Sequence, residues 1–189
     1  MSVEKNKRLH RPLPYLNYLN ECFIVSDNGK LIWKDRPKEH FNGWYGYKGW
    51  NKKYAGKIAD VENGDGYFLV CINKIRYKSH RIVFYMSFGI DPKDMQIDHK
   101  NGNRGDNRKE NLRLATQSQN SINFKGNRAD SKNKYPRGVS WNKGNKKFEA
   151  SVCVLGNNKY LGLFDSIEDA KHCASMARKE NFGEFWNEC

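Results

Sequence analysis

The chain has 189 residues, of which 34 are Lys or Arg and 21 are Asp or Glu, giving a formal net charge of +13. This surplus predicts a polyanionic partner, because cationic side chains release the counterions that condense on phosphates. The length suits one ordinary domain or two to three small modules.

Cysteine spacing and the absence of long apolar runs narrow the class of protein. The cysteines are odd in number, far apart and without a Cys-x-x-Cys pair, which argues against a disulfide framework and against structural zinc: Cys22, Cys71, Cys153, Cys173 and Cys189. Residues 1–12 carry charge but no following apolar stretch, so we expect no signal peptide. We therefore expect a soluble, intracellular protein without membrane-spanning segments.

Residues 1–66 form the first predicted module. Residues 13–22 have apolar side chains at helical spacing, and residues 23–34 read as a β-hairpin around Asn28-Gly29. Residues 35–54 are Gly-rich with aromatic residues between cations, and we expect them to be irregular. Their rings could stack on bases, or form a satellite core over the main sheet, and we favour the core. A short strand is expected at 55–60.

A second predicted module covers residues 67–124. Strands are expected at 67–72 and 75–78, joined by an Asn73-Lys74 turn, and a helix is expected from His80 to Gly89 with Ser79 as its cap. His80 and Arg81 lie at the start of this helix, where they could approach a phosphate. For His80 we favour a structural role.

The stretch from Gln96 to Asn123 concentrates polar residues in a distinctive order. A short strand leads into Asp98 and His99, an Asn- and Gly-rich loop follows, and residues 112–115 alternate as a second strand. Thr116 with Gln119 forms a capping box, so a helix begins there and Asn120 lies about one turn into it. Oxygen ligands suit a hard divalent cation, and a neutral imidazole beside them can take a proton from water. Phosphodiester hydrolysis needs both parts.

A series of short polar motifs runs through this stretch, in the order Asp98-His99-Lys100-Asn101-Gly102-Asn103, Asn107, Glu110-Asn111-Leu112-Arg113 and Asn120. This series resembles the HNH endonuclease family in its H-N-N form, which is similar to phage homing nucleases. The resemblance implies a ββα-metal fold in which Asp98 is a metal ligand, His99 the general base and Asn111 the residue that braces the loop. It implies Asn120 as second metal ligand, with Asn123 as the alternative. Mg²⁺ is the expected ion, and Mn²⁺ a possible substitute.

Residues 125–134 form a basic linker, in which Lys125 and Arg128 are expected to contact phosphates. Residues 135–189 predict three strands, at 138–142, 147–154 and 159–164, and a helix capped by Ser166. Phe148, Ala150, Val152 and Val154 are expected to share one face of this sheet, and Trp141 to lie in its core.

This last module resembles the plant ethylene-response-factor DNA-binding domain through Arg137-Gly138-Val139, Lys147-Phe148, Tyr160-Leu161-Gly162, Phe164-Asp165 and its Ala-spaced helix. The resemblance implies a DNA-binding sheet face with Arg137, Ser140, Asn142, Lys147, Ser151 and Tyr160. Phosphate positioning is expected from Arg137, Lys143, Lys146, Lys147 and Lys159.

The sequence as a whole predicts an α+β protein: a ββα-metal nuclease module followed by a three-stranded antiparallel sheet with one helix. We expect a metal-dependent endonuclease of double-stranded DNA, of homing type, acting as a monomer or weak dimer; if phage-encoded it would work in the host cytoplasm. Two alternatives stay open. One is a DNA-binding transcriptional regulator built on an inactive nuclease scaffold, and the other is a nuclease selective for branched or structured nucleic acid.

Overall fold

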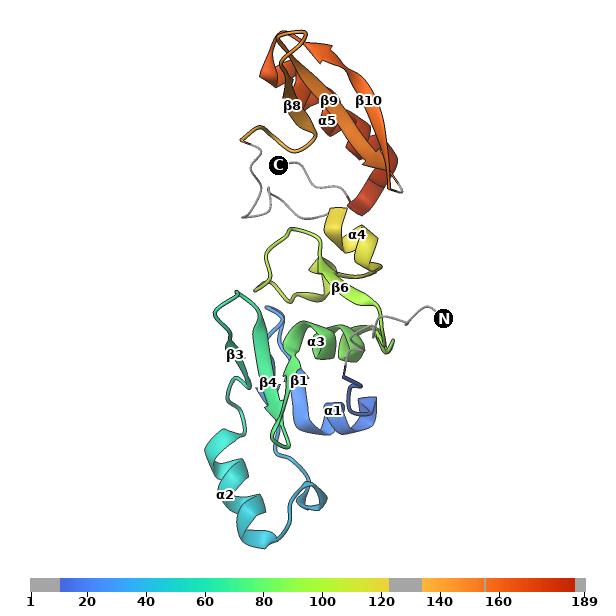
Figure 1. Cartoon of the computed structure of the whole chain (residues 1–189). Coiled ribbons are helices and arrows are strands. Elements are labelled where there is room, and N and C mark those ends of the chain that lie inside the picture. The colour runs from blue at the N-terminus through green and yellow to red at the C-terminus, as the bar shows by residue number, and fades with distance from the viewer. Residues whose placement is uncertain (1–10, 123–133, 155, 186–189) are drawn as a thin grey trace, which may run out of the picture. The chain divides into compact units, whose positions relative to one another are not determined.

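The protein forms two compact units, Met1–Gln117 and Ser118–Cys189, in a computed structural model that describes residues 11–122, 134–154 and 156–185 (Figure 1). Both units combine helices with small antiparallel sheets. The predicted α+β class is therefore confirmed. Within the described ranges, no helix is long and apolar enough to cross a membrane.

The N-terminal unit begins with helix α1 (Leu16–Cys22) and the hairpin of β1 (Phe23–Val25) and β2 (Leu31–Trp33). Phe23 pairs with Trp33 and Val25 with Leu31, so the predicted hairpin is confirmed. Its turn contains Gly29 in a left-handed conformation with φ of 74°. A short 3₁₀ turn, η1 (Lys38–His40), follows.

Residues 44–54 form a helix, α2 (Trp44–Tyr54), so the expectation of irregular structure throughout 35–54 is wrong. Tyr47, Trp50 and Tyr54 recur at spacings of three and four residues, which places them on one helical face. Gly46 and Gly49, which weaken a helix, obscure that period in the sequence. Trp50 and Tyr54 pack against the main hydrophobic core, as the satellite-core interpretation expected.

A three-stranded sheet of β3 (Asp60–Glu62), β4 (Phe68–Ile72) and β5 (Ile75–Lys78) follows, with β4 in the centre. The strand expected at 55–60 thus starts only at residue 60. Helix α3 (Ser79–Phe88) ends at Gly89, which adopts the expected left-handed conformation. Asn73 and Lys74 form the β4–β5 turn with φ of 49° and 65°.

One hydrophobic core joins these elements. Its buried members come from α1, β1, β2, β4, α3 and the strands that follow, so the core draws on residues on both sides of position 66. They include Leu19, Phe23, Leu31, Val70, Ile82, Val83, Ile97 and Leu112. Burial of this apolar surface fixes α3 beneath the strands that carry Asp98 and His99.

Those strands are β6 (Gln96–His99) and β7 (Leu112–Ala115), with the 3₁₀ turn η2 (Lys109–Asn111) between them. Helix α4 (Gln117–Ile122) begins two residues after β7. The predicted strand–loop–strand–helix order is confirmed.

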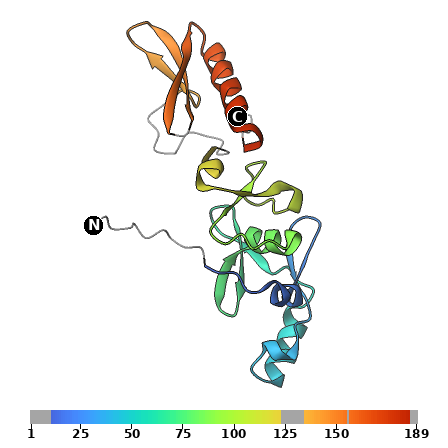
Figure 2. The same cartoon turned by 90° about the vertical axis from the view of Figure 1, so that its right-hand side faces the viewer.

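The C-terminal unit contains β8 (Val139–Asn142), β9 (Lys147–Val154) and β10 (Asn157–Phe164), with β9 in the centre. Helix α5 (Ile167–Phe182), capped by the Ser166 side chain, lies along one face of this sheet (Figure 2), and the 3₁₀ turn η3 (Gly183–Phe185) follows. Val139, Ala150, Ala170 and Ala174 form its core, because small side chains let the helix approach the strands closely.

The expectation that Trp141 lies in this core is wrong, since 39% of the residue is exposed. It shares the inner face with Val139, but it stands at the margin, where its ring meets Phe148 edge-on at 4.8 Å.

Candidate active site

Two adjacent polar residues at the end of β6 are buried. The β6–β7 register places Asp98 opposite Arg113 and His99 opposite Leu112. Asp98 is 4% exposed and His99 5% exposed, although both types of side chain are usually solvated. Burial of such groups requires specific partners.

His99 finds its partner in the loop between the strands. Its Nε2 lies 3.0 Å from Oδ1 of Asn107, a residue that is only 1% exposed. An amide oxygen can only accept, so Nε2 donates and Nδ1 keeps its lone pair. Burial lowers the pKa of His99 below its ordinary value of 6.5, while the Asn107 hydrogen bond and Asp98 oppose that shift. The imidazole is therefore a neutral base at physiological pH.

Asn111 holds the loop that carries Asn107. Its Oδ1 accepts from the Asn101 backbone N–H at 3.0 Å, and its Nδ2 donates to the Asn101 side chain at 3.1 Å and to the Asp106 carbonyl at 2.7 Å. Asp106 in turn receives two hydrogen bonds from the Arg108 guanidinium, which lowers the pKa of that carboxyl to about 2. The loop is thus fixed by side chains rather than by a strand ladder.

Asp98 is held by an arginine that the sequence analysis did not single out. Nε of Arg113 donates to Oδ2 of Asp98 at 2.8 Å, and its second guanidinium nitrogen lies 2.7 Å from the same oxygen. Arg113 is itself buried. A charged residue inside the apolar run Leu112-Arg113-Leu114 was the available signal, because a buried strand tolerates a charge only when it is paired.

Comparison with known proteins shows what the segment that contains this site is similar to. Residues 77–122 match the HNH endonuclease family model. This range contains β6, the loop, β7 and α4, and thus every residue of the site described above.

A protein of Acanthamoeba polyphaga mimivirus, described as an uncharacterized HNH endonuclease, is 33% identical over 107 residues. The alignment covers 56% of this chain and 54% of the viral protein, so the chain spans about half the length of the curated relative it matches. No solved structure matches the chain with statistical significance. The family match ends at residue 122, so the likeness of the C-terminal unit to an ethylene-response-factor domain stays a prediction.

Two further rings lie near His99, one from the first turn of α3 and one from the residue that precedes β4. His80, which is 4% exposed, meets His99 edge-on with ring centroids 5.1 Å apart, and Tyr67 lies 5.4 Å from His80 and 6.2 Å from His99. The sequence placed His80 at the start of a helix but gave no sign of this neighbour.

Tyr67 also links the site to exposed cations. Lys78 Nζ lies 4.7 Å and Arg104 Cζ 5.0 Å from the centre of its ring. Arg104 additionally donates to the Asp65 carbonyl at 3.2 Å. The positive charges of Lys78 and Arg104 therefore lie near the buried histidines, where they can attract a phosphate.

Residues 77–122 offer oxygen ligands of the kind that a hard cation prefers, but few of them are predicted to bind one. Asp98 and Asn120 offer oxygen atoms, as Mg²⁺ prefers, and Mg²⁺ commonly retains several waters. In the described ranges, no group of three or more His, Cys, Asp or Glu residues is arranged to hold a metal. Asn120 lies in α4, of which every residue but Gln117 belongs to the C-terminal unit. Its role as second ligand stays a prediction, and Asn123, the alternative, lies outside the described residues.

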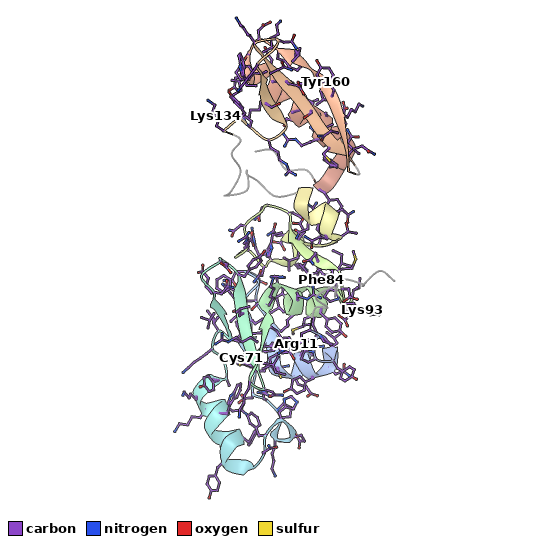
Figure 3. The ribbon with its side chains drawn as sticks, viewed as in Figure 1. Arg11, Cys71, Phe84, Lys93, Lys134 and Tyr160 are labelled. Carbon is purple, nitrogen blue, oxygen red and sulfur yellow. The ribbon has the colours of Figure 1, made fainter. Side chains whose placement is uncertain are left out.

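The residues predicted to bind DNA in the C-terminal unit lie on different surfaces. Register pairs Asn142 with Lys147 and Tyr160 with Ser151, which puts these four on the sheet face opposite α5. Figure 3 labels Tyr160, which is 60% exposed. Lys159, however, pairs with the buried Val152 and so leaves the sheet on the helix side.

Several of these side chains already have local partners. Asn142 donates to Glu149 at 2.9 Å and accepts from the Asn145 backbone at 3.0 Å, and Lys147 lies 3.1 Å from Asp165. Arg137 is half-buried and Lys143 exposed. Lys125 and Arg128 lie outside the described residues.

Proposed function

We propose that the chain is an endonuclease that hydrolyses phosphodiester bonds in double-stranded DNA with the help of a divalent cation, Mg²⁺ or Mn²⁺. The observation that carries the proposal is the buried His99, held as a neutral base by Asn107 beside the Asp98 carboxylate. The match of residues 77–122 to the HNH endonuclease family supports it.

His99 is the general base. Nδ1 takes a proton from a water molecule, whose oxygen attacks the phosphorus atom, and the bond to the leaving 3′ oxygen breaks. Asn107 keeps the ring oriented and accepts the Nε2 hydrogen bond, which becomes stronger when the ring is protonated. Asn111 maintains the loop that presents Asn107 and acts on the reaction only through it.

Asp98 and Asn120 would hold the cation, which when bound supplies positive charge against the phosphate. Lys78 and Arg104, which both lie near the Tyr67 ring, would position the same phosphate. Because a single HNH segment supplies one such site, a monomer would cut one strand at a time.

The C-terminal sheet would hold the duplex. Its exposed face lies opposite α5, and Arg137, Lys143, Lys147 and Tyr160 would contact the DNA backbone. The basic linker with Lys125 and Arg128 would continue this contact. A site-seeking enzyme of homing type fits a separate DNA-holding unit beside a cutting unit.

A second candidate is a DNA-binding regulator on an inactive nuclease scaffold. The Asp98–Arg113 ion pair favours it, because a cation at Asp98 would share the carboxylate with a guanidinium 2.7 Å away. In this case DNA binding would persist without cleavage in any metal.

Incubation of supercoiled plasmid with purified protein in Mg²⁺, Mn²⁺ or EDTA separates these candidates. The nuclease proposal expects metal-dependent nicking or linearisation. DNA binding without cutting in every metal would support the regulator instead. Fragments with defined ends would indicate a preferred site, whereas preferential cutting of branched substrates would indicate selectivity for structure.

A further inference from the structure

In Figure 1, α2 lies at the opposite end of the N-terminal unit from β6. Residues of β2, α2 and the β4–β5 turn line a cavity of about 470 Å³. Its walls are aromatic rings from β2, α2 and the segment between them, namely Trp33, Phe41, Trp50 and Tyr54. The volume falls within the range of about 300–1,000 Å³ that is usual for sites of small organic ligands. The HNH chemistry makes no use of this cavity.

Arg36 supplies a fixed positive charge in the wall. It is 5% exposed, and its Cζ lies 5.0 Å from the ring centres of both Phe41 and Trp50. One guanidinium nitrogen donates to the Tyr18 hydroxyl at 2.7 Å, and Nε donates to Nδ1 of His40 at 3.3 Å. The guanidinium is therefore locked among the rings, where it favours planar, electron-rich ligands.

The mouth of the cavity is also basic. Lys74 lines it from the β4–β5 turn, and Lys53 holds its Nζ 5.1 Å from the centre of the Tyr54 ring. Both lysines are exposed. Among the described residues that line the cavity there is no Asp or Glu, and the carboxylate hydrogen-bonded to a lining residue, Glu21, lies 2.7 Å from Nε2 of His40. The charged side chains of the lining itself are therefore cationic.

We propose that this cavity binds one unpaired nucleotide of a nucleic acid, with its base against the aromatic rings and its phosphate at Lys74 and Lys53. A base is planar and stacks on aromatic side chains regardless of its identity. A base inside a duplex is stacked on both faces and paired, so neither of its faces is available to these rings. The ligand is thus a single strand or a base turned out of a duplex, and the site would direct the protein to DNA that contains unpaired nucleotides.

Binding to a labelled single-stranded oligonucleotide and to the matching duplex, measured by fluorescence anisotropy in EDTA, tests the proposal without any cleavage. Tyr54→Leu removes one ring but keeps an apolar side chain, and Lys74→Asn removes one charge. Asn suits this position because it tolerates the left-handed backbone of Lys74, where φ is 65°.

Each variant has a matched control. Tyr45→Leu makes the same change on the same helix at a residue that is 92% exposed and does not line the cavity. Lys93→Asn removes a charge at another left-handed position, with φ of 42°, and Figure 3 shows Lys93 well separated from Cys71 of the cavity.

Tyr54→Leu should weaken single-strand binding about tenfold, within the range of one lost stacking contact. Lys74→Asn should flatten the log–log salt dependence by about 0.7 units, the share of one phosphate on a single strand. Both controls should bind like the wild type. Equal losses in the controls, equal losses for duplex and single strand, or unchanged single-strand binding in both cavity variants would overturn the proposal.

Cys71 allows the occupant to be located in the unaltered protein. Its thiol is exposed and lines the cavity. Saturating single-stranded oligonucleotide should slow its alkylation by N-ethylmaleimide several-fold, as followed by peptide mass spectrometry, and perfect duplex should not. A duplex with one unpaired, extruded base should also protect Cys71 if turned-out bases enter. An alkylation rate unaffected by saturating single strand would show that the cavity is empty and would refute the assignment.

Discussion

The turn of the β1–β2 hairpin supports the loop that carries Asn107. A Cβ atom at Gly29 would overlap the carbonyl carbon of Asn107 and lie 2.5 Å from the backbone nitrogen of Arg108. Gly29 also has φ of +74°, a conformation that L side chains rarely adopt. Gly29→Ala should therefore displace the Asn107 backbone and disturb its hydrogen bond to His99, because backbone atoms cannot rotate aside as a flexible side chain can.

Two terms set the size of this effect. The left-handed conformation costs about 1–2 kcal/mol for a residue with a Cβ, and forcing extra volume into a packed site costs about 1–3 kcal/mol. Gly29→Ala should thus lower the free energy of unfolding by about 2–5 kcal/mol. Gly56→Ala is the matched control, since Gly56 has φ of +75° but nothing within 4 Å of the added Cβ. Gly56→Ala should therefore show only the cost of the left-handed conformation.

Urea unfolding of both variants measures the difference, and plasmid cleavage at a temperature where both are folded measures its consequence. We expect Gly29→Ala to be the less stable of the two and to cut more slowly, because His99 loses its orientation. Equal free energies of unfolding for the two variants would refute the close approach of hairpin and loop.

Three other predictions concern the proposed general base and the C-terminal sheet. In a pH–rate profile, the cleavage rate should rise with pH and level off above a midpoint lower than 6.5, because burial lowers the pKa of His99 and only the neutral ring accepts a proton. A midpoint above 6.5 would contradict this prediction. Asn107→Asp keeps a hydrogen-bond acceptor but adds negative charge, so the midpoint of the pH–rate profile should move upward. Asn107→Ala should instead slow cleavage at every pH. Identical pH–rate profiles for both variants would argue against the hydrogen bond between Asn107 and His99. In the C-terminal unit, Arg137→Gln with Lys143→Gln should flatten the salt dependence of duplex binding by about two units, and Lys179→Gln on α5 should leave it unchanged.

Local sequence signals predicted most of the fold. The Asn28-Gly29 and Asn73-Lys74 turns, the Ser166 cap and the alternation in β9 each depend on neighbouring residues, and all are confirmed. The sequence did not predict the α2 helix, because Gly46 and Gly49 have low helix propensity. Its aromatic stripe forms only when Trp33 and Phe41 offer rings to pack on, at 4.8 Å and 5.6 Å from Trp50. That information lies outside the segment.

The candidate site shows the same division. The order of Asp98, His99 and Asn111 was visible in the sequence. The pairing of Asp98 with Arg113 depends on strand register, and the edge-on contact of His80 with His99 depends on how α3 packs under β6. The charge of Arg113 within an apolar run indicates that it needs a partner but not which one, and His80 has no local signal for its neighbour. The two pairs are 15 and 19 positions apart, so they meet only after the core has formed. The strand that contains Lys159 was predicted from its local pattern. That pattern did not show which face of the sheet the Lys159 side chain would take.

We propose above all that His99 is the general base of a DNA-cleaving site. Single-turnover cleavage of a saturating complex by wild type and by His99→Ala tests it most directly, with duplex affinity measured in EDTA for both proteins. Loss of a general base should slow cleavage by about 10²–10⁴-fold, while DNA affinity stays within a few fold because His99 is buried. Cleavage by His99→Ala within a few fold of wild type, at equal affinity, would contradict the account.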